Sequence, residues 1–344
     1  MASQAGQIRQ PLQPSIRPIL DPEYVTLHDS LVQYVEPLES KPWDPENRNK
    51  PSALAHAQPK LVDVGQCFDK VLGNVQLRVF VPEGEAPAKG WPCMVWYHGG
   101  GWVNGGLGSD NGFLSHVCRY TRCMAISVNY RHAPEDVYPA ALEDSFWGFQ
   151  WIRNNAATLS IDISRLVLGG CSAGGNLAAV MSLKAGLAKL SPAPVFQLLI
   201  CPVIDCTATV NTAWATTQHS PFLTPGRMTW YQDRYLPNPS DRANWDVSPC
   251  FAPPETLALS PKTFVAIAEC DLLAPEGLRY AELLRKAGVE VETKTYKGAT
   301  HSILVLAGIH QIGQQLVHDA CAVIARELGT EYDPSTSPIL SQSG

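Results

Sequence analysis

A single serine stands in a setting typical of a hydrolytic nucleophile. Residues 170–174 read Gly-Cys-Ser-Ala-Gly and fit the pattern G-x-S-x-G, with Ser172 at its centre. The apolar run 166–168 precedes this pattern and a helix-forming segment follows it, so a strand is predicted to turn sharply into a helix and expose the serine. Glycines give such a turn its backbone freedom, and the helix N-terminus favours developing negative charge. The same five residues also fit an ordinary glycine-rich turn, and only residues elsewhere in the chain can distinguish the two interpretations.

A nucleophilic serine needs a histidine base, and the order in a nucleophile elbow is serine, acid, histidine. Four histidines follow Ser172. His301 comes directly after a predicted strand, where its imidazole can reach the carboxyl edge of a sheet. His310 and His318 fall in the predicted last helix, where a solvated surface position is the simpler interpretation, and His219 lies in an irregular segment. We predict His301 as the base.

The carboxylate that orients the base is predicted at Asp271. It follows the apolar run 263–268 and precedes a helix, which places it at the same edge of the sheet. Asp205 also follows a strand and is the second candidate, while Glu269 is an adjacent alternative. A purely structural role for Asp271 as a helix cap is the competing interpretation.

Oxyanion donors are predicted in residues 98–102, which read His-Gly-Gly-Gly-Trp and follow another apolar run. Three successive glycines let the backbone approach a substrate and direct N–H groups toward it. Their spacing excludes a G-x-G-x-x-G nucleotide-binding turn. The N–H of Ala173, directly after the nucleophile, is the expected second donor.

Alternating strand and helix patterns position these residues. Predicted strands cover residues 61–69, 75–81, 93–97, 124–129, 166–168, 196–201, 263–268 and 289–296. Predicted helices cover residues 22–36, 111–120, 143–154, 173–189, 275–287 and 308–328. This alternation predicts an α/β fold whose central sheet is mostly parallel and flanked by helices.

Two segments interrupt the alternation. Residues 1–60 are rich in proline and contain one short amphipathic helix, which cannot form a core of its own and is expected to cover the main body. Residues 205–255 are rich in aromatic residues and proline, which is typical of a lid or binding loop. We therefore expect a core formed by 61–204 and 256–328, a cap formed by the arm 1–60 and the insertion 205–255, and a flexible tail over 329–344.

Composition narrows the class of protein. The 344 residues carry a net charge of −6 and no basic run, which argues against a nucleic-acid partner. No apolar run is long enough to span a membrane, and the polar N-terminus does not resemble a signal peptide. The ten cysteines show no regular spacing, so we expect a reduced, cytoplasmic protein without a structural zinc site.

The chain resembles the hormone-sensitive-lipase-like branch of the α/β hydrolases, which includes microbial carboxylesterases and arylacetamide deacetylases. The resemblance covers about residues 60–328 and rests on motifs at 98–102, 130–135, 139–144, 172–176, 268–273 with 280–284, and 298–301. It implies an α/β-hydrolase fold with a cap, Ser172, Asp271 and His301 as a catalytic triad, and no cofactor or metal. It further implies that Gly100, Gly101 and Ala173 donate to the oxyanion.

Three positions depart from the pattern of this family. Cys171 stands where the family usually has Asp or Thr, Ser302-Ile303 replaces a Gly-Phe pair, and His132 replaces a customary Leu. None of them removes a catalytic group, although each could reshape the pocket. Cys171 is not expected to be the nucleophile, because its side chain should point away from the site.

Together these features predict a serine hydrolase that cleaves a carboxylic ester through an acyl-enzyme. The aromatic cap suggests an apolar or aromatic small-molecule substrate, with Trp102 and Phe222 as substrate contacts, and an ester or lactone of secondary metabolism fits this description. Amide or thioester cleavage by the same triad is the alternative, followed by a non-hydrolytic ligand-binding relative. The resemblance also implies pairing of two copies through an edge strand, for which 289–296 is the candidate.

Overall fold

A single eight-stranded sheet forms the centre of the computed structural model, which describes residues 7–50 and 52–337. The strands are β1 (Gln66–Leu72), β2 (Val75–Val81), β3 (Trp91–Tyr97), β4 (Met124–Asn129), β5 (Ile161–Cys171), β6 (Phe196–Ile200), β7 (Lys262–Ala268) and β8 (Val291–Tyr296). Their order is β1-β2-β4-β3-β5-β6-β7-β8. Strand β2 runs antiparallel to β1 and β4, and every other neighbouring pair is parallel. The mostly parallel sheet predicted from the sequence is therefore present.

The apolar character of the inner strands follows from their position. Strands β3 and β6 are buried at every residue, because helices cover both faces of the sheet. The outermost strands β1 and β8 alternate between exposed and partly covered residues. The parallel strands direct their carboxyl ends to one edge, which is where the predicted catalytic residues were expected to meet.

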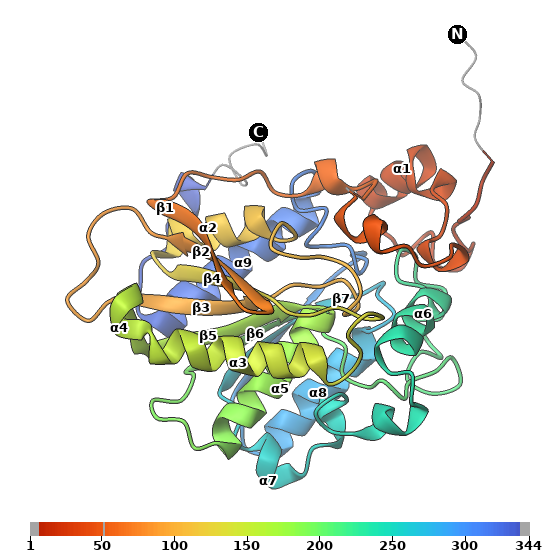
Figure 1. The fold of residues 1–344 in the computed structure, drawn as a ribbon. Helices are drawn as coiled ribbons and strands as arrows, with labels where there is room; N and C mark the ends of the chain where they lie inside the picture. The colour runs from red at the N-terminus through yellow and green to blue at the C-terminus, as the bar shows by residue number, and fades with distance from the viewer. Residues whose placement is uncertain (1–6, 51, 338–344) are drawn as a thin grey trace.

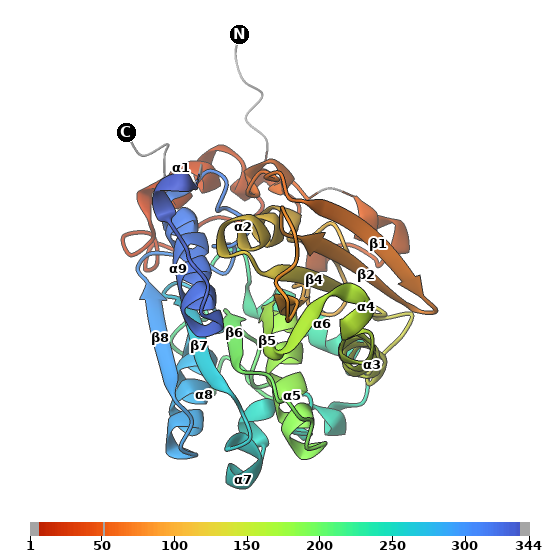
Figure 2. The ribbon, with the colours of Figure 1, turned by 90° about the vertical axis from the view of Figure 1, so that its left-hand side faces the viewer.

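Helices form a layer on each face of this sheet (Figures 1 and 2). Helices α2 (Asn111–Thr121) and α9 (Gln311–Leu328) pack together on one face. Helices α3 (Ala140–Asn154), α5 (Ala173–Leu187) and α8 (Ala274–Lys286) cover the other face. Two single-turn helices, α4 (Ala156–Leu159) and α7 (Pro254–Leu257), lie at the ends of this second layer.

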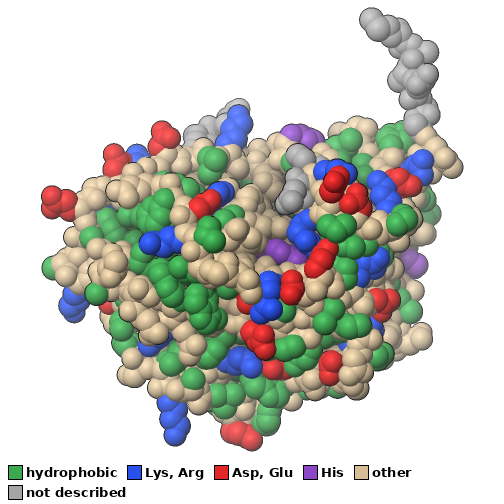
Figure 3. All heavy atoms as spheres, in the orientation of Figure 1, with side chains coloured by type: hydrophobic (Ala, Val, Ile, Leu, Met, Phe, Trp, Pro, Cys, Tyr) green, Lys and Arg blue, Asp and Glu red, His purple; other side chains and the backbone are tan. Residues whose placement is uncertain are grey.

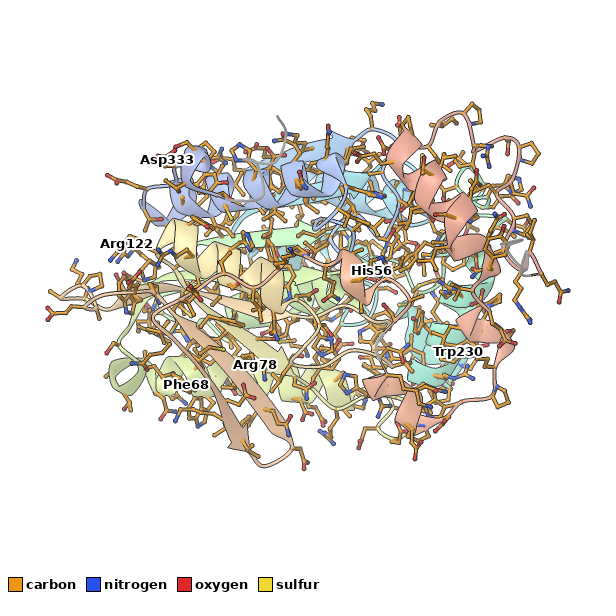
Figure 4. The ribbon with its side chains drawn as sticks, turned by 90° about the horizontal axis from the view of Figure 1, so that it is seen from above. His56, Phe68, Arg78, Arg122, Trp230 and Asp333 are labelled. Carbon is orange, nitrogen blue, oxygen red and sulfur yellow. The ribbon has the colours of Figure 1, made fainter. Side chains whose placement is uncertain are left out.

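The N-terminal arm and the insertion lie against one another beside the sheet (Figure 1). The arm contains α1 (Pro22–Ser30) and several 3₁₀ turns, and the insertion contains α6 (Pro225–Tyr235). The indoles of Trp43 in the arm and Trp230 on α6 pack edge to face with centroids 6.0 Å apart. Figure 4 shows Trp230 on α6 directly beside the arm. The two irregular segments of the sequence therefore form one continuous layer.

Two expectations about individual elements need correction. The helix expected over 22–36 ends at Ser30 and continues as a 3₁₀ turn over Val32–Tyr34. The first strand begins at Gln66 rather than at residue 61, so 61–65 is an extended approach to the sheet. In the tail, the hydroxyl of Tyr332 lies 2.9 Å from Nδ1 of His318 on α9, and the flexibility of this segment stays a prediction. Residues 338–344 lie outside the described part of the chain.

The surface and the cysteines add two observations. Acidic and basic side chains are interspersed over the face shown in Figure 3, without a large area of one sign. All ten cysteines are free thiols, and nine of them are buried. Within the described residues, no helix combines the length and the apolar character needed to cross a bilayer.

Candidate active site

Ser172 occupies a sharp turn between β5 and α5. Its backbone has φ 57° and ψ −119°, a conformation that a non-glycine residue adopts only when its surroundings enforce it. Its N–H donates to the carbonyl of Ile200 at 2.9 Å, and its own carbonyl accepts from Asn176 at 3.0 Å. A Cβ on Gly174 would lie 1.9 Å from the carbonyl oxygen of Tyr97, so the helix can cross the sheet this closely only with glycine at that position. The turn has the geometry of a nucleophile elbow.

Three predicted side chains meet at the carboxyl edge of the sheet. His301 Nε2 lies 2.9 Å from Ser172 Oγ, and His301 Nδ1 lies 2.8 Å from Asp271 Oδ2. Asp271 also accepts a hydrogen bond from the N–H of Leu273 through its other carboxylate oxygen. Asp271 is almost fully buried, and Ser172 and His301 each retain only a small exposed fraction. In such an arrangement an imidazole can take the proton of a serine while a carboxylate orients the ring.

The two other candidates for the orienting carboxylate, Asp205 and Glu269, form hydrogen bonds and ion pairs with other residues. Asp205 accepts from the backbone and hydroxyl of Thr207 and pairs with Arg279 at 3.2 Å. Glu269 pairs with Lys297 and accepts the N–H of Gly298. Neither carboxylate is hydrogen-bonded to His301.

The remaining histidines have other surroundings. His219 is exposed. His318 contacts Tyr332 as described above. His310 was expected on a solvated helix surface, but it is buried at the residue before α9, where its ring meets Tyr24 edge to face with centroids 6.5 Å apart. That expectation was wrong because the N-terminal arm covers this end of the helix.

The glycine loop runs beside the nucleophile. A Cβ on Gly99 would lie 3.5 Å from Cβ of Ser172. Gly100 and Gly101 have φ of +117° and +63°, and a Cβ on Gly100 would lie 2.2 Å from the carbonyl oxygen of Asn104. Among the described residues, the N–H groups of Gly100 and Gly101 have no backbone or side-chain acceptor in the protein. Ala173 is the first residue of α5, where N–H groups have no partner within the helix.

The two aromatic residues predicted to contact substrate differ in position. Trp102 is fully buried, and its indole stacks on Tyr235 with centroids 4.5 Å apart, so it presents no surface to a ligand in this arrangement. Phe222 is partly buried and its ring faces the imidazole of His301, with centroids 6.5 Å apart and planes inclined by 27°. Phe222 therefore borders His301, whereas Trp102 packs against Tyr235 of α6.

Two cysteines lie close to the triad without resembling nucleophiles. Cys171 packs in the core layer that contains residues of α2 and α9, and burial raises the pKa of its thiol well above the ordinary value. Cys201 Sγ, a carboxylate oxygen of Asp271 and a ring nitrogen of His301 all lie within 4.8 Å of one another. Burial also raises the pKa of Cys201, so both thiols stay protonated.

Sequence reasoning missed several neighbours of the site. Tyr231 of α6 covers the glycine loop, because a Cβ on Gly101 would lie 2.3 Å from its ring. The hydroxyl of Tyr231 accepts from the side-chain amide of Asn104 at 3.3 Å. An aromatic pattern pointed to the insertion as a whole, but it contained no signal for which ring would lie on Gly101.

Comparisons with known proteins agree with this geometry. A family model for the α/β-hydrolase fold matches residues 94–305. An AB hydrolase superfamily protein of Schizosaccharomyces pombe is 36% identical over 90% of this chain and 94% of its own length. The carboxylesterase NlhH of Mycobacterium tuberculosis is 33% identical over 75% of this chain and 80% of its own length. The crystal structure of a thermostable esterase from Pseudomonas putida superposes with a TM-score of 0.81 at 29% identity, covering 91% of this chain and 99% of that one.

The sheet, the elbow at Ser172 and these matches together define a family. The chain belongs to the α/β hydrolases, in the branch that contains carboxylesterases.

Proposed function

We propose that this enzyme hydrolyses carboxylic esters of small to medium size through a covalent acyl-enzyme on Ser172. That it is a carboxylic ester hydrolase follows from its family and from relatives named carboxylesterase, ethyl acetate hydrolase and esterase. The observation that carries the proposed mechanism is the position of His301, which lies within hydrogen-bond distance of both Ser172 and Asp271.

In the first half of the reaction, Ser172 Oγ attacks the ester carbonyl carbon while His301 Nε2 takes its proton. Asp271 accepts the hydrogen bond from His301 Nδ1 and stabilises the imidazolium that forms. The N–H groups of Gly100, Gly101 and Ala173 bind the oxyanion, and one such donor is worth about 3 kcal/mol. Collapse of the tetrahedral intermediate breaks the C–O bond, and the leaving alcohol receives the proton from His301.

The second half repeats these steps with water. His301 removes a proton from the water as it attacks the acyl carbon, and the same three N–H groups bind the second oxyanion. Collapse releases the carboxylic acid and returns the proton to Ser172 Oγ. Every proton transfer passes through His301, so the mechanism needs no further titratable group.

Aromatic side chains around the site support an apolar or aromatic substrate. Phe222 borders His301 and Tyr231 covers Gly101, so a bound ester would have ring surfaces close to both of its ends. An ester or lactone of secondary metabolism is our proposal within this class. Amides and thioesters are the alternative substrates for the same triad. A panel of acyl lengths, aryl acetates, lactones, amides and thioesters distinguishes them by kcat/KM.

Replacement of the nucleophile tests the mechanism directly. Ser172→Ala should lower the turnover of p-nitrophenyl butyrate by at least about 10³-fold and abolish labelling by a fluorophosphonate probe. An unlabelled wild-type protein would instead indicate a non-hydrolytic ligand-binding relative. Retained turnover in a folded Ser172→Ala variant would contradict the assignment of Ser172.

Two further proposals concern the protein's surroundings. A cytoplasmic location is supported by the ten free cysteines, which a reducing compartment would preserve. Pairing of two copies through β8 is supported by its position at the edge of the sheet, where one side lacks a partner strand. Light scattering of a variant with proline in place of Thr293, at the centre of β8, would test the pairing against the wild type.

A further inference from the structure

Phe222 is held against the catalytic base in an unfavourable backbone conformation. Its φ is +68°, in the left-handed region that a bulky residue rarely adopts. Its ring nevertheless faces the His301 imidazole. Such a conformation persists only where neighbouring contacts fix it, so the contacts that fix Phe222 also control what lies next to His301.

Arg227, in the first turn of α6, contacts Phe222 twice. Its guanidinium donates a hydrogen bond to the carbonyl of Phe222, and its Cζ lies 5.7 Å from the centre of the Phe222 ring. One side chain therefore holds both the backbone and the ring of Phe222. The hydrogen bond to the carbonyl is made to the residue whose backbone has the unfavourable φ, so it helps to hold that conformation.

The N-terminal arm in turn fixes Arg227. Its Nε donates to Glu39 Oε2 at 2.9 Å, and a second guanidinium nitrogen donates to Gln10 at 3.3 Å. Thr224, two residues after Phe222 in the insertion, donates to the other carboxylate oxygen of Glu39 at 3.2 Å. The side chains of Arg227 and Glu39 are only 12% and 21% exposed, so solvent screens this pair less than it screens a surface ion pair.

A cavity of about 250 Å³ with both polar and apolar lining residues, among them Leu12 and Pro221, lies beside Phe222. Phe222 lines it together with Glu39, His28 and Ser220. The same residue also borders His301, so Phe222 belongs both to the lining of this cavity and to the surroundings of the base.

We propose that Arg227 is a positioning residue that, held by Glu39 of the N-terminal arm, keeps Phe222 against His301 and so limits the size of the substrate group accepted there. The arm thereby determines specificity without contacting the substrate. Release of Phe222 opens the site toward this cavity, where apolar residues such as Leu12 and Pro221 can contact longer groups. This inference rests on the proposed ester hydrolysis at Ser172.

The test compares p-nitrophenyl esters from acetate to octanoate in Glu39→Gln, Arg227→Met and Phe222→Ala. Each variant should raise the octanoate-to-acetate ratio of kcat/KM about tenfold, mainly through KM for the longer ester, because a pocket discriminates added methylenes by about this amount. In Glu39→Gln and Arg227→Met, the kcat for acetate should stay within about threefold of wild type, since neither residue contacts the reacting atoms. A loss of stability alone would not change this ratio.

Arg242→Met is the matched control. Arg242 also pairs with a carboxylate in the cap, Asp233 at 2.6 Å, but has no contact with Phe222. The octanoate-to-acetate ratio of kcat/KM in Arg242→Met should equal that of wild type. The double variant Phe222→Ala with Arg227→Met should match Phe222→Ala alone, because Arg227 acts through that ring.

Two results would overturn the inference: unchanged ratios in Glu39→Gln and Arg227→Met, or additive effects in the double variant. Glu39→Gln keeps the shape of the side chain, so it gives an answer even if Arg227→Met does not fold. If the wild-type protein hydrolysed no ester of the series, that result would count against the proposed function and not against this inference.

Discussion

At the scale of single residues, the elbow contains an unusual cysteine beside the serine. Cys171 and Ser172 are adjacent, yet their surroundings separate their roles. Ser172 Oγ meets His301, whereas the Cys171 thiol is buried in an apolar core layer and its pKa is raised. A thiol that stays protonated and is not accessible is a poor nucleophile. These surroundings support the proposed role of Ser172 as the nucleophile and argue against one for Cys171.

Replacement of Cys171 tests this separation. Cys171→Ala should keep kcat/KM within about threefold of wild type, because the thiol that is removed is buried in the core and takes no part in the proposed reaction. Its free energy of unfolding should fall by about 1 kcal/mol through the lost packing. Steady-state kinetics and urea unfolding measure the two effects. Loss of fluorophosphonate labelling in the folded variant would argue that the thiol takes part in acylation.

At the scale of elements, the crossing of β5, β3 and α5 sets the position of the nucleophile. The crossing is so close that a Cβ on Gly170 would lie 2.1 Å from the carbonyl oxygen of Gly174, and one on Gly174 would overlap the backbone of Tyr97. The glycines are required here by close approach of backbone to backbone. The glycines of the motif are therefore explained by the close packing of α5 on β3 and β5.

Gly174→Ala should therefore destabilise the protein by more than about 3 kcal/mol, because backbone cannot move aside as a flexible side chain can. Gly226→Ala is the matched control in the first turn of α6, where the nearest atom to a new Cβ is 3.9 Å away. Its free energy of unfolding should stay within about 0.5 kcal/mol of wild type. Urea unfolding compares both, and equal stabilities would refute the steric argument.

At the scale of the whole molecule, buried histidines link stability to pH. Burial lowers the pKa of His98 to about 4, from an ordinary value of 6.5. Burial lowers the pKa of His132 to about 2, with nearby His98 and Arg48 adding to the effect. The rings of these two histidines stack with centroids 5.3 Å apart. The folded protein thus keeps both imidazoles neutral at pH values where the unfolded chain binds protons.

The stability that these histidines contribute is fully present above about pH 6.5, because at lower pH only the unfolded state takes up the protons. It is lost as the pH falls toward 4 for His98 and toward 2 for His132. Each imidazole contributes a slope of about 1.4 kcal/mol per pH unit in that range. His132→Leu removes one of them, so its free energy of unfolding should fall less steeply between pH 6 and 4.5. Urea unfolding at several pH values measures the slopes, and parallel slopes would contradict this account.

The sequence by itself predicted the family, the proposed catalytic residues and most of the elements of the fold. Ser172, Asp271 and His301 were predicted because each follows shortly after a strand, and parallel strands end at one edge of a sheet. Most strands and helices of the core were predicted to within a few residues, since buried strands and long amphipathic helices have distinct patterns. The end of α1 and the start of β1 were misjudged, because weakly patterned segments take their ends from tertiary contacts.

Only the tertiary structure decided how the N-terminal arm and the insertion meet the site. Trp102 and Phe222 were both expected at the substrate, yet Trp102 stacks on Tyr235 and Phe222 faces His301. Glu39 and Arg227 are separated by 188 residues, and no local pattern predicts that they pair. A triad residue is recognisable from its strand because local structure fixes where it must lie. The N-terminal arm and the insertion have little regular structure of their own. Their contacts therefore depend on the surface of the folded core, which a local sequence pattern does not predict.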